Sequence, residues 1–178
     1  TAQYEALLGI LLAHLERFSS GPSIVRAQLC LALAAFTAKG GFKSLQDLQT
    51  RINNPTILLA VLAGVPHELE RAVTLLGDSG SMQQLLSGPW SVHVLDMCLP
   101  LINEADTPFL VLGLECIAAW LHCIHLTTTD LVASRRILIE KALLLLIRSA
   151  YDVDDVCQAA AAVLYEVADY HVGALKVI

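Results

Sequence analysis

A helical phrase recurs along this chain of 178 residues, and its spacing restricts the fold more than any other feature. The phrase starts with a β-branched residue or Leu, continues with small residues and ends with Leu or an aromatic residue. Clear copies are Val25–Leu33 and Val156–Leu164, and a looser copy is Leu112–Leu121. Their starting positions differ by multiples of about 43 to 44 residues, the period of paired-helix repeats of the HEAT or armadillo type. The sequence therefore predicts a stack of helix pairs.

Turn residues divide the chain into helices with short connections. The run Ser19-Ser20-Gly21-Pro22 ends a first amphipathic helix and starts a second. We predict that Gly40-Gly41 ends this second helix, and that a helix capped by Asn54-Pro55 ends at Gly64. Thr107-Pro108 marks the start of a later helix. No alternation typical of strands occurs, so we predict an all-α fold, an α-solenoid of about four HEAT-like helix pairs.

The whole chain, residues 1–178, is predicted to form a single HEAT-repeat segment. Its approximate repeats are residues 1–39, 40–77, 82–125 and 128–171, and residues 172–178 start a further helix. The chain starts with Thr and ends inside an apolar helical stretch, so we expect an internal fragment of a longer protein.

The apolar content raises the question of a membrane protein. Hydrophobic residues make up 56% of the chain, whereas average soluble domains contain about 45–50%. The best candidate among the uncharged runs, Ile52–His67, has 16 residues and includes two Asn and two Pro residues. A membrane span needs about 18 or more apolar residues without such breakers. We therefore predict no membrane insertion, and we attribute the excess to helices that are buried on more than one side.

The formal net charge of −6 and the absence of a run rich in Lys and Arg indicate the class of partner. Direct nucleic-acid binding is not expected, because phosphate neutralisation requires a basic patch. A mild acidic excess instead suits basic protein partners. The predicted protein-binding residues are Glu104, Asp106, Asp130, Asp152, Asp154 and Asp155.

Two interpretations of these acidic residues stay open. Asp152, Asp154 and Asp155 cluster where a helix is predicted to start. The helix dipole stabilises negative charge there by about 0.3–1 kcal/mol for each residue, so the cluster has a structural explanation. The functional alternative is an acidic contact for an arginine- or lysine-rich cargo.

Several motifs suggest chemistry, but none is complete. The Gly77–Gly80 loop copies the sequence around the nucleophile of trypsin-like proteases, whose β-barrel and His/Asp partners have no counterpart here. Gly40–Ser44 lacks the spacing of a phosphate-binding loop and no strand precedes it. Cys116, His122, Cys123 and His125 do not converge as the four ligands of zinc must. We predict no catalytic, cofactor-binding or metal-binding residues. A helical enzyme domain that uses His122 or His125 remains an alternative.

Other chemistry-bearing residues have structural interpretations. The five cysteines are odd in number and form no CxxC pair, so we predict buried free thiols in a reducing compartment. Trp120 lies in a stretch that is apolar on several faces, so it is predicted to be a core residue. Arg135-Arg136 interrupts an apolar helix, where one guanidinium is expected to link neighbouring repeats.

Four segments resemble the importin-β superfamily of nuclear transport receptors, most closely its transportin-SR and importin-thirteen branch. Gly21–Ala34 is similar to a "GP-x-x-[IV]-R-x-QL-C-x-AL" phrase early in those receptors, and Leu114–Leu121 to their "LEC-x-x-SWL" phrase. Ile57–Glu68 resembles their "LLE-x-L-x-x-[VL]-PEE" phrase, and Asp155–Ala160 occupies the place of a later helix motif. The order and approximate spacing agree across nearly the whole chain.

This resemblance implies a carrier made of many stacked HEAT repeats that shuttles between nucleus and cytoplasm. Such receptors bind protein cargo, which in this branch includes basic or Arg/Ser-rich proteins. They also bind the GTPase Ran in its GTP form and FG-repeat nucleoporins, and in importins Ran-GTP releases the cargo. The resemblance therefore implies a role in nuclear import. The alternative is a HEAT- or armadillo-type scaffold or regulatory subunit outside nuclear transport.

Overall fold

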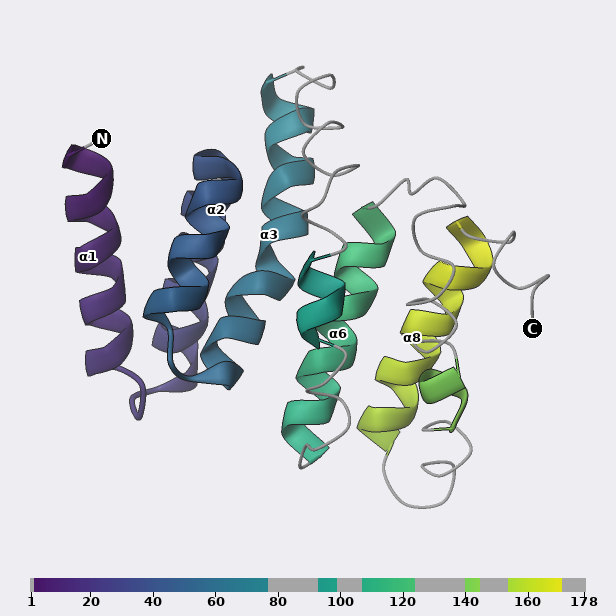
Figure 1. Cartoon of the computed structure of the whole chain (residues 1–178). Helices are drawn as coiled ribbons and strands as arrows, with labels where there is room; N and C mark the ends of the chain where they lie inside the picture. Colours follow the sequence, from purple (N-terminus) through teal and green to yellow (C-terminus); the bar gives the residue numbers. More distant parts are fainter. Residues whose placement is uncertain (1, 77–92, 99–106, 124–139, 145–153, 171–178) are drawn as a thin grey trace. The chain divides into compact units, whose positions relative to one another are not determined.

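The computed structural model describes residues 2–76, 93–98, 107–123, 140–144 and 154–170. Its labelled helices are α1 (Ala2–Arg17), α2 (Ser23–Arg51), α3 (Pro55–Leu76), α6 (Thr107–Cys123) and α8 (Asp154–Tyr170) (Figure 1). Residues 93–98 and 140–144 are also helical. No strand occurs in these ranges, and the predicted all-α fold is confirmed. The chain divides into two compact units, Thr1–Ser79 and Gly80–Ile178.

In the first unit, α1 and α2 meet at the predicted turn. The N–H of Gly21 donates to the carbonyl of Phe18 at 2.9 Å, which closes the turn after α1. Pro22 immediately precedes α2, where its missing N–H costs nothing because the first N–H groups of a helix have no intrahelical acceptor. Leu8 and Leu15 of α1 are buried, which fixes the helix against its neighbour.

The prediction that a helix ends at Gly40-Gly41 is wrong, because α2 continues through both glycines to Arg51. A straight helix of 29 residues would be about 43 Å long. However, Phe36 and Arg51 both contact residues in the first turn of α1, so α2 bends sharply between them (Figure 1). Glycine pairs are a known cause of such kinks. The boundary expected between residues 39 and 40 therefore lies inside one bent helix.

The prediction of a helix end at Gly64 is also wrong. α3 extends from Pro55 to Leu76 with Pro66 in its interior. Because proline has no N–H and its ring crowds the preceding turn, an interior proline kinks a helix. The ribbon of α3 changes direction midway, as expected from this residue (Figure 1). Val65 and Leu69 on either side of it are completely buried, and this packing keeps the helix continuous.

The start of α3 follows the prediction. The side-chain oxygen Oδ1 of Asn54 accepts hydrogen bonds from the N–H groups of Thr56 at 3.0 Å and Ile57 at 3.3 Å. These donors belong to the first turn, which has no carbonyl partners within the helix. Asn54 is therefore the N-cap, and Pro55 occupies the first helical position.

Small residues allow α2 and α3 to approach each other closely. A Cβ atom at Gly64 would lie 3.0 Å from the Cβ of Ala34 and 3.6 Å from Leu31. The surrounding core contains Leu33, Leu45, Leu48, Leu59, Val61 and Leu62, all essentially without solvent contact. The absence of a larger side chain at Gly64 and Ala34 lets the backbones of these two consecutive helices come close together.

In the second unit, α6 and α8 pack side by side and run in the same direction (Figure 1). His122 near the end of α6 contacts Glu166 near the end of α8, across a sequence separation of 44 residues. This separation equals the spacing of the helical phrases at Leu112 and Val156, which lie in these two helices. Equivalent helices of successive repeats in a solenoid stack in this way.

The core of the second unit is apolar and contains the predicted tryptophan. Trp120 is completely buried, which confirms its assignment to the core. The other buried side chains of α6 and α8 are Leu114, Cys116, Ile117, Leu121, Val156, Ala159, Ala160, Val163 and Val167. The small side chains of α8 face this core, so the bulk of Trp120 supplies much of its volume.

Candidate interaction surface

The described residues include only two of the six predicted acidic contacts. Glu104, Asp106, Asp130 and Asp152 lie outside the residues that the structure describes. Asp154 is the first residue of α8, and the side chain of Asp155 is exposed in the first turn of that helix. This is the end of a helix where the backbone N–H groups favour negative charge. The position of Asp155 is compatible with both interpretations, and its carboxylate lies at the surface.

Exposed apolar side chains form a second candidate contact surface on the first two helices. Leu7 and Ile10 lie one turn apart on α1 and are 48% and 54% exposed. Ile24 and Leu31 lie two turns apart on α2 and are 70% and 43% exposed. Exposed apolar groups are candidates for contact with other macromolecules where they lie together on a surface, as the neighbouring positions within each helix allow. The sequence did not identify these exposed residues as a contact surface.

Of the four residues considered as zinc ligands, the two with described side chains, Cys116 and His122, have different partners. The thiol of Cys116 is buried and lies beside Cys98, with the two sulfur atoms 3.8 Å apart. The ring nitrogen Nδ1 of His122 instead lies 3.0 Å from Oε2 of Glu166. His125 lies outside the described residues, as does the side chain of Cys123. Among the residues with described positions, no three His, Cys, Asp or Glu side chains form a metal-binding group.

The other motifs also fail as sites, or lie outside the described residues. Residues Gly40–Ser44 are helical, so their N–H groups are used within α2 and do not form the open loop that phosphate binding requires. Gly77–Gly80 and Arg135-Arg136 lie outside the residues that the structure describes.

Cys30, Cys98 and Cys116 are buried free thiols, as predicted, whereas Cys157 is partly exposed.

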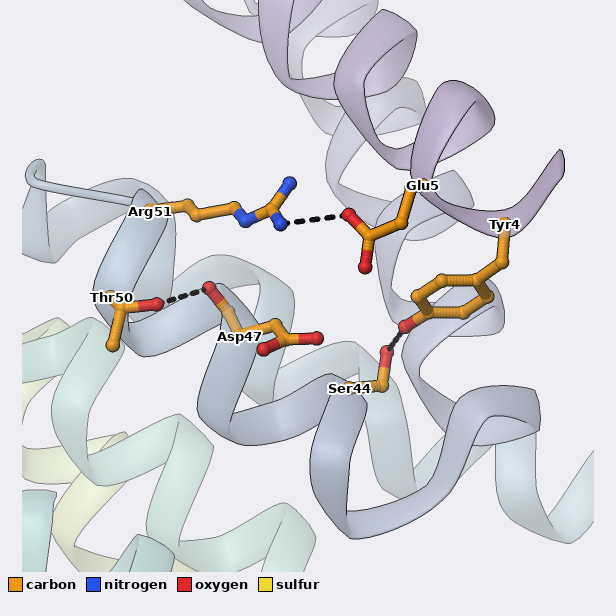
Figure 2. Close-up of polar contacts among 6 residues, drawn as sticks. All are labelled: Tyr4, Glu5, Ser44, Asp47, Thr50 and Arg51. Atoms are coloured by element: carbon orange, nitrogen blue, oxygen red, sulfur yellow. Dashed lines mark hydrogen bonds and ion pairs between the residues drawn. The ribbon is translucent and has the colours of Figure 1, made fainter. Parts of the chain in front are cut away.

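A polar cluster that sequence analysis had missed joins the start of α1 to the part of α2 beyond the bend (Figure 2). The hydroxyl of Tyr4 forms a hydrogen bond with the hydroxyl of Ser44, which is buried. The guanidinium of Arg51 pairs with Oε2 of Glu5 at 2.8 Å. The Tyr4 ring also stacks on Phe36, before the bend, with ring centroids 4.3 Å apart. The first turn of α1 therefore contacts α2 on both sides of its bend.

These contacts differ in their energetic weight. The Arg51–Glu5 pair has side chains that are 40% and 49% exposed. Solvent screens such a pair, and its contribution is about 0–1 kcal/mol. Ser44 is 1% exposed, so a loss of its hydrogen-bond partner leaves a buried hydroxyl with a desolvation cost. The Tyr4–Ser44 contact is therefore the part of the cluster on which the bend most depends.

Replacing Tyr4 by Phe should lower the free energy of unfolding by about 1–2 kcal/mol, because the Ser44 hydroxyl loses this partner. The stack on Phe36 is retained, so the change isolates the hydroxyl. Urea titrations followed by circular dichroism measure the effect. The double variant Tyr4→Phe/Ser44→Ala should recover part of the loss, since neither polar group remains. No loss in Tyr4→Phe would show that the hydroxyl contact does not stabilise the bend.

Comparisons with protein-family models, curated proteins and solved structures give no match for this chain. The functional proposal therefore depends on the residues themselves. In the described part of the chain, no helix combines the length and the apolar character that crossing a membrane would require.

Proposed function

We propose that this chain is a segment of a nuclear transport receptor of the importin-β superfamily. The segment binds protein cargo and Ran-GTP through a superhelical array of HEAT repeats and acts in nuclear import. The observation that carries the proposal is the parallel packing of α6 and α8 at a sequence separation of 44 residues. The choice of this family among helical-repeat proteins is supported by the resemblance of four segments to the transportin-SR branch. One of these segments is Leu114–Leu121 in α6.

The proposed mechanism is binding coupled to a change in curvature. Each unit of a solenoid contacts only its neighbours, so small changes at every interface add along the array. A partner that binds one curvature more tightly then alters the affinity for another partner. Acidic side chains such as Asp155 suit basic cargo, and the exposed apolar residues of α1 and α2 suit contacts with FG-repeat nucleoporins.

The test is binding of the intact protein to Ran loaded with GTP, with Ran loaded with GDP as the matched control. We expect retention of the GTP form only. Solution scattering of the protein with and without Ran-GTP should then give different radii of gyration. Binding to neither form would contradict the proposal. In that case the helical stack would favour the alternative of a scaffold or regulatory subunit outside nuclear transport, and protein partners would be sought without Ran.

A further inference from the structure

The buried thiols of Cys98 and Cys116 lie together in the second unit, although 18 residues separate them in sequence. Cys98 is the last of the described helical residues 93–98, and Cys116 lies in the middle of α6. Both side chains are completely inaccessible to solvent. Their sulfur atoms are 3.8 Å apart and share a thiol hydrogen bond. The fold therefore places two oxidisable groups against each other with no side chain between them.

We propose that Cys98 and Cys116 are a redox modification site that closes to an intramolecular disulfide when the protein meets a low-molecular-weight disulfide such as oxidised glutathione. A disulfide requires an S–S distance of about 2.05 Å and Cβ atoms about 3.5–4.5 Å apart. The observed separation of 3.8 Å between the sulfur atoms is close to this bonding distance, and bond formation requires the two side chains to move closer together. The bond would link residues 93–98 covalently to α6.

The reaction is a pair of thiol–disulfide exchanges. The thiolate of one cysteine attacks a sulfur of the small disulfide, forms a mixed disulfide and releases one small thiol. The thiolate of the other cysteine then attacks the cysteine sulfur of the mixed disulfide and releases the second small thiol. The protein loses two electrons and two protons. The small disulfide gains both electrons, and its two halves leave as protonated thiols.

The surroundings of the pair determine how fast this happens. The pKa of Cys116 is raised well above its usual value. The main cause is the hydrogen bond with Cys98, followed by burial and by electrostatic interaction with Cys98. Because the thiolate is the reacting form, exchange in the native protein is slow and becomes faster at alkaline pH. Access also requires local opening around residues 93–98. The site therefore responds to sustained oxidation, and a thiol reductant reverses it.

The test treats the intact protein with oxidised glutathione at mildly alkaline pH, followed by alkylation and proteolysis without reduction. We expect a peptide that links Cys98 to Cys116, a mass loss of two hydrogen atoms, and a Tm raised by several degrees because the unfolded chain is constrained. Reduction should restore the original mass and Tm. Cys98→Ser should abolish the linked peptide, whereas Cys30→Ser, which removes another buried thiol, should leave it unchanged.

A second arm separates poor access from wrong geometry. The same oxidation is repeated at a urea concentration below the unfolding transition, where local opening is more frequent. A faster appearance of the same linkage supports the proposal. Separate glutathione adducts on the two cysteines, or no linkage under either condition, would overturn it. So would linkage that appears only after unfolding and joins the cysteines indiscriminately.

Discussion

Replacing Trp120 by Ala should lower the free energy of unfolding by about 3–5 kcal/mol, the largest effect expected from any single substitution described for this chain. The indole is completely buried, and the buried side chains that α8 contributes to the core of this unit are alanine and valine. These small side chains cannot fill the cavity that the substitution leaves. A domain is typically stable by only about 5–15 kcal/mol, so a large share of the total would be lost.

Chemical denaturation followed by circular dichroism measures this loss, with Tyr165→Ala as the matched control. Tyr165 is also an aromatic residue of this unit, but its side chain on α8 is 63% exposed. Its replacement should change the stability by no more than about 0.5 kcal/mol, as is usual for surface positions. Equal losses in the two variants would contradict the burial of Trp120 in the core.

The second large effect is expected at the bend of α2. Replacing Gly40 by Ala places a Cβ atom 2.7 Å from the Cβ of Ser44 and 2.9 Å from the hydroxyl oxygen of Tyr4. Overpacking of this kind costs about 1–3 kcal/mol, which exceeds the gain in helix propensity of up to about 1 kcal/mol. We expect a net loss of about 1–2 kcal/mol and weaker contact between Tyr4 and Ser44.

The control for this substitution is Gly9→Ala on α1. A Cβ atom at Gly9 would meet nothing within 4 Å, so only the helix propensity changes. This variant should be more stable than the parent by about 0.5–1 kcal/mol. Thermal and denaturant unfolding of the two variants side by side give the comparison. If both glycine replacements stabilise the protein, the structure accommodates a Cβ atom at Gly40 without cost. That result would contradict the proposal that Gly40 is needed to make room for Ser44 and Tyr4.

Local signals in the sequence predicted the helical class and some helix ends. Asn54-Pro55 was identifiable because an N-cap depends on a side chain and the backbone two or three residues later. Burial of Trp120 followed from the apolar residues around it in one helix. Such features depend on residues that are close in sequence, so they can be predicted from a local sequence pattern.

Features that depend on distant residues were not predictable. Gly40 and Gly64 resembled helix ends, but both lie inside helices where another group approaches the backbone closely. Sequence alone does not tell a glycine that ends a helix from one that makes room for a neighbour. Tyr4–Ser44 and Glu5–Arg51 join residues 40 and 46 positions apart, and they form only because α2 bends. Among the six predicted acidic contacts, only Asp155 has a described side chain.

The continuity of α2 across its bend also determines how this part of the chain can come apart. In an ordinary helical repeat array, each pair unfolds with its own equilibrium, and fraying can stop at the loop between pairs. Here the predicted repeats 1–39 and 40–77 share the helix α2. Residues in the first turn of α1 contact this helix on both sides of its bend. Melting of either pair removes backbone hydrogen bonds that the other requires. We therefore expect residues 2–76 to unfold together as one cooperative unit.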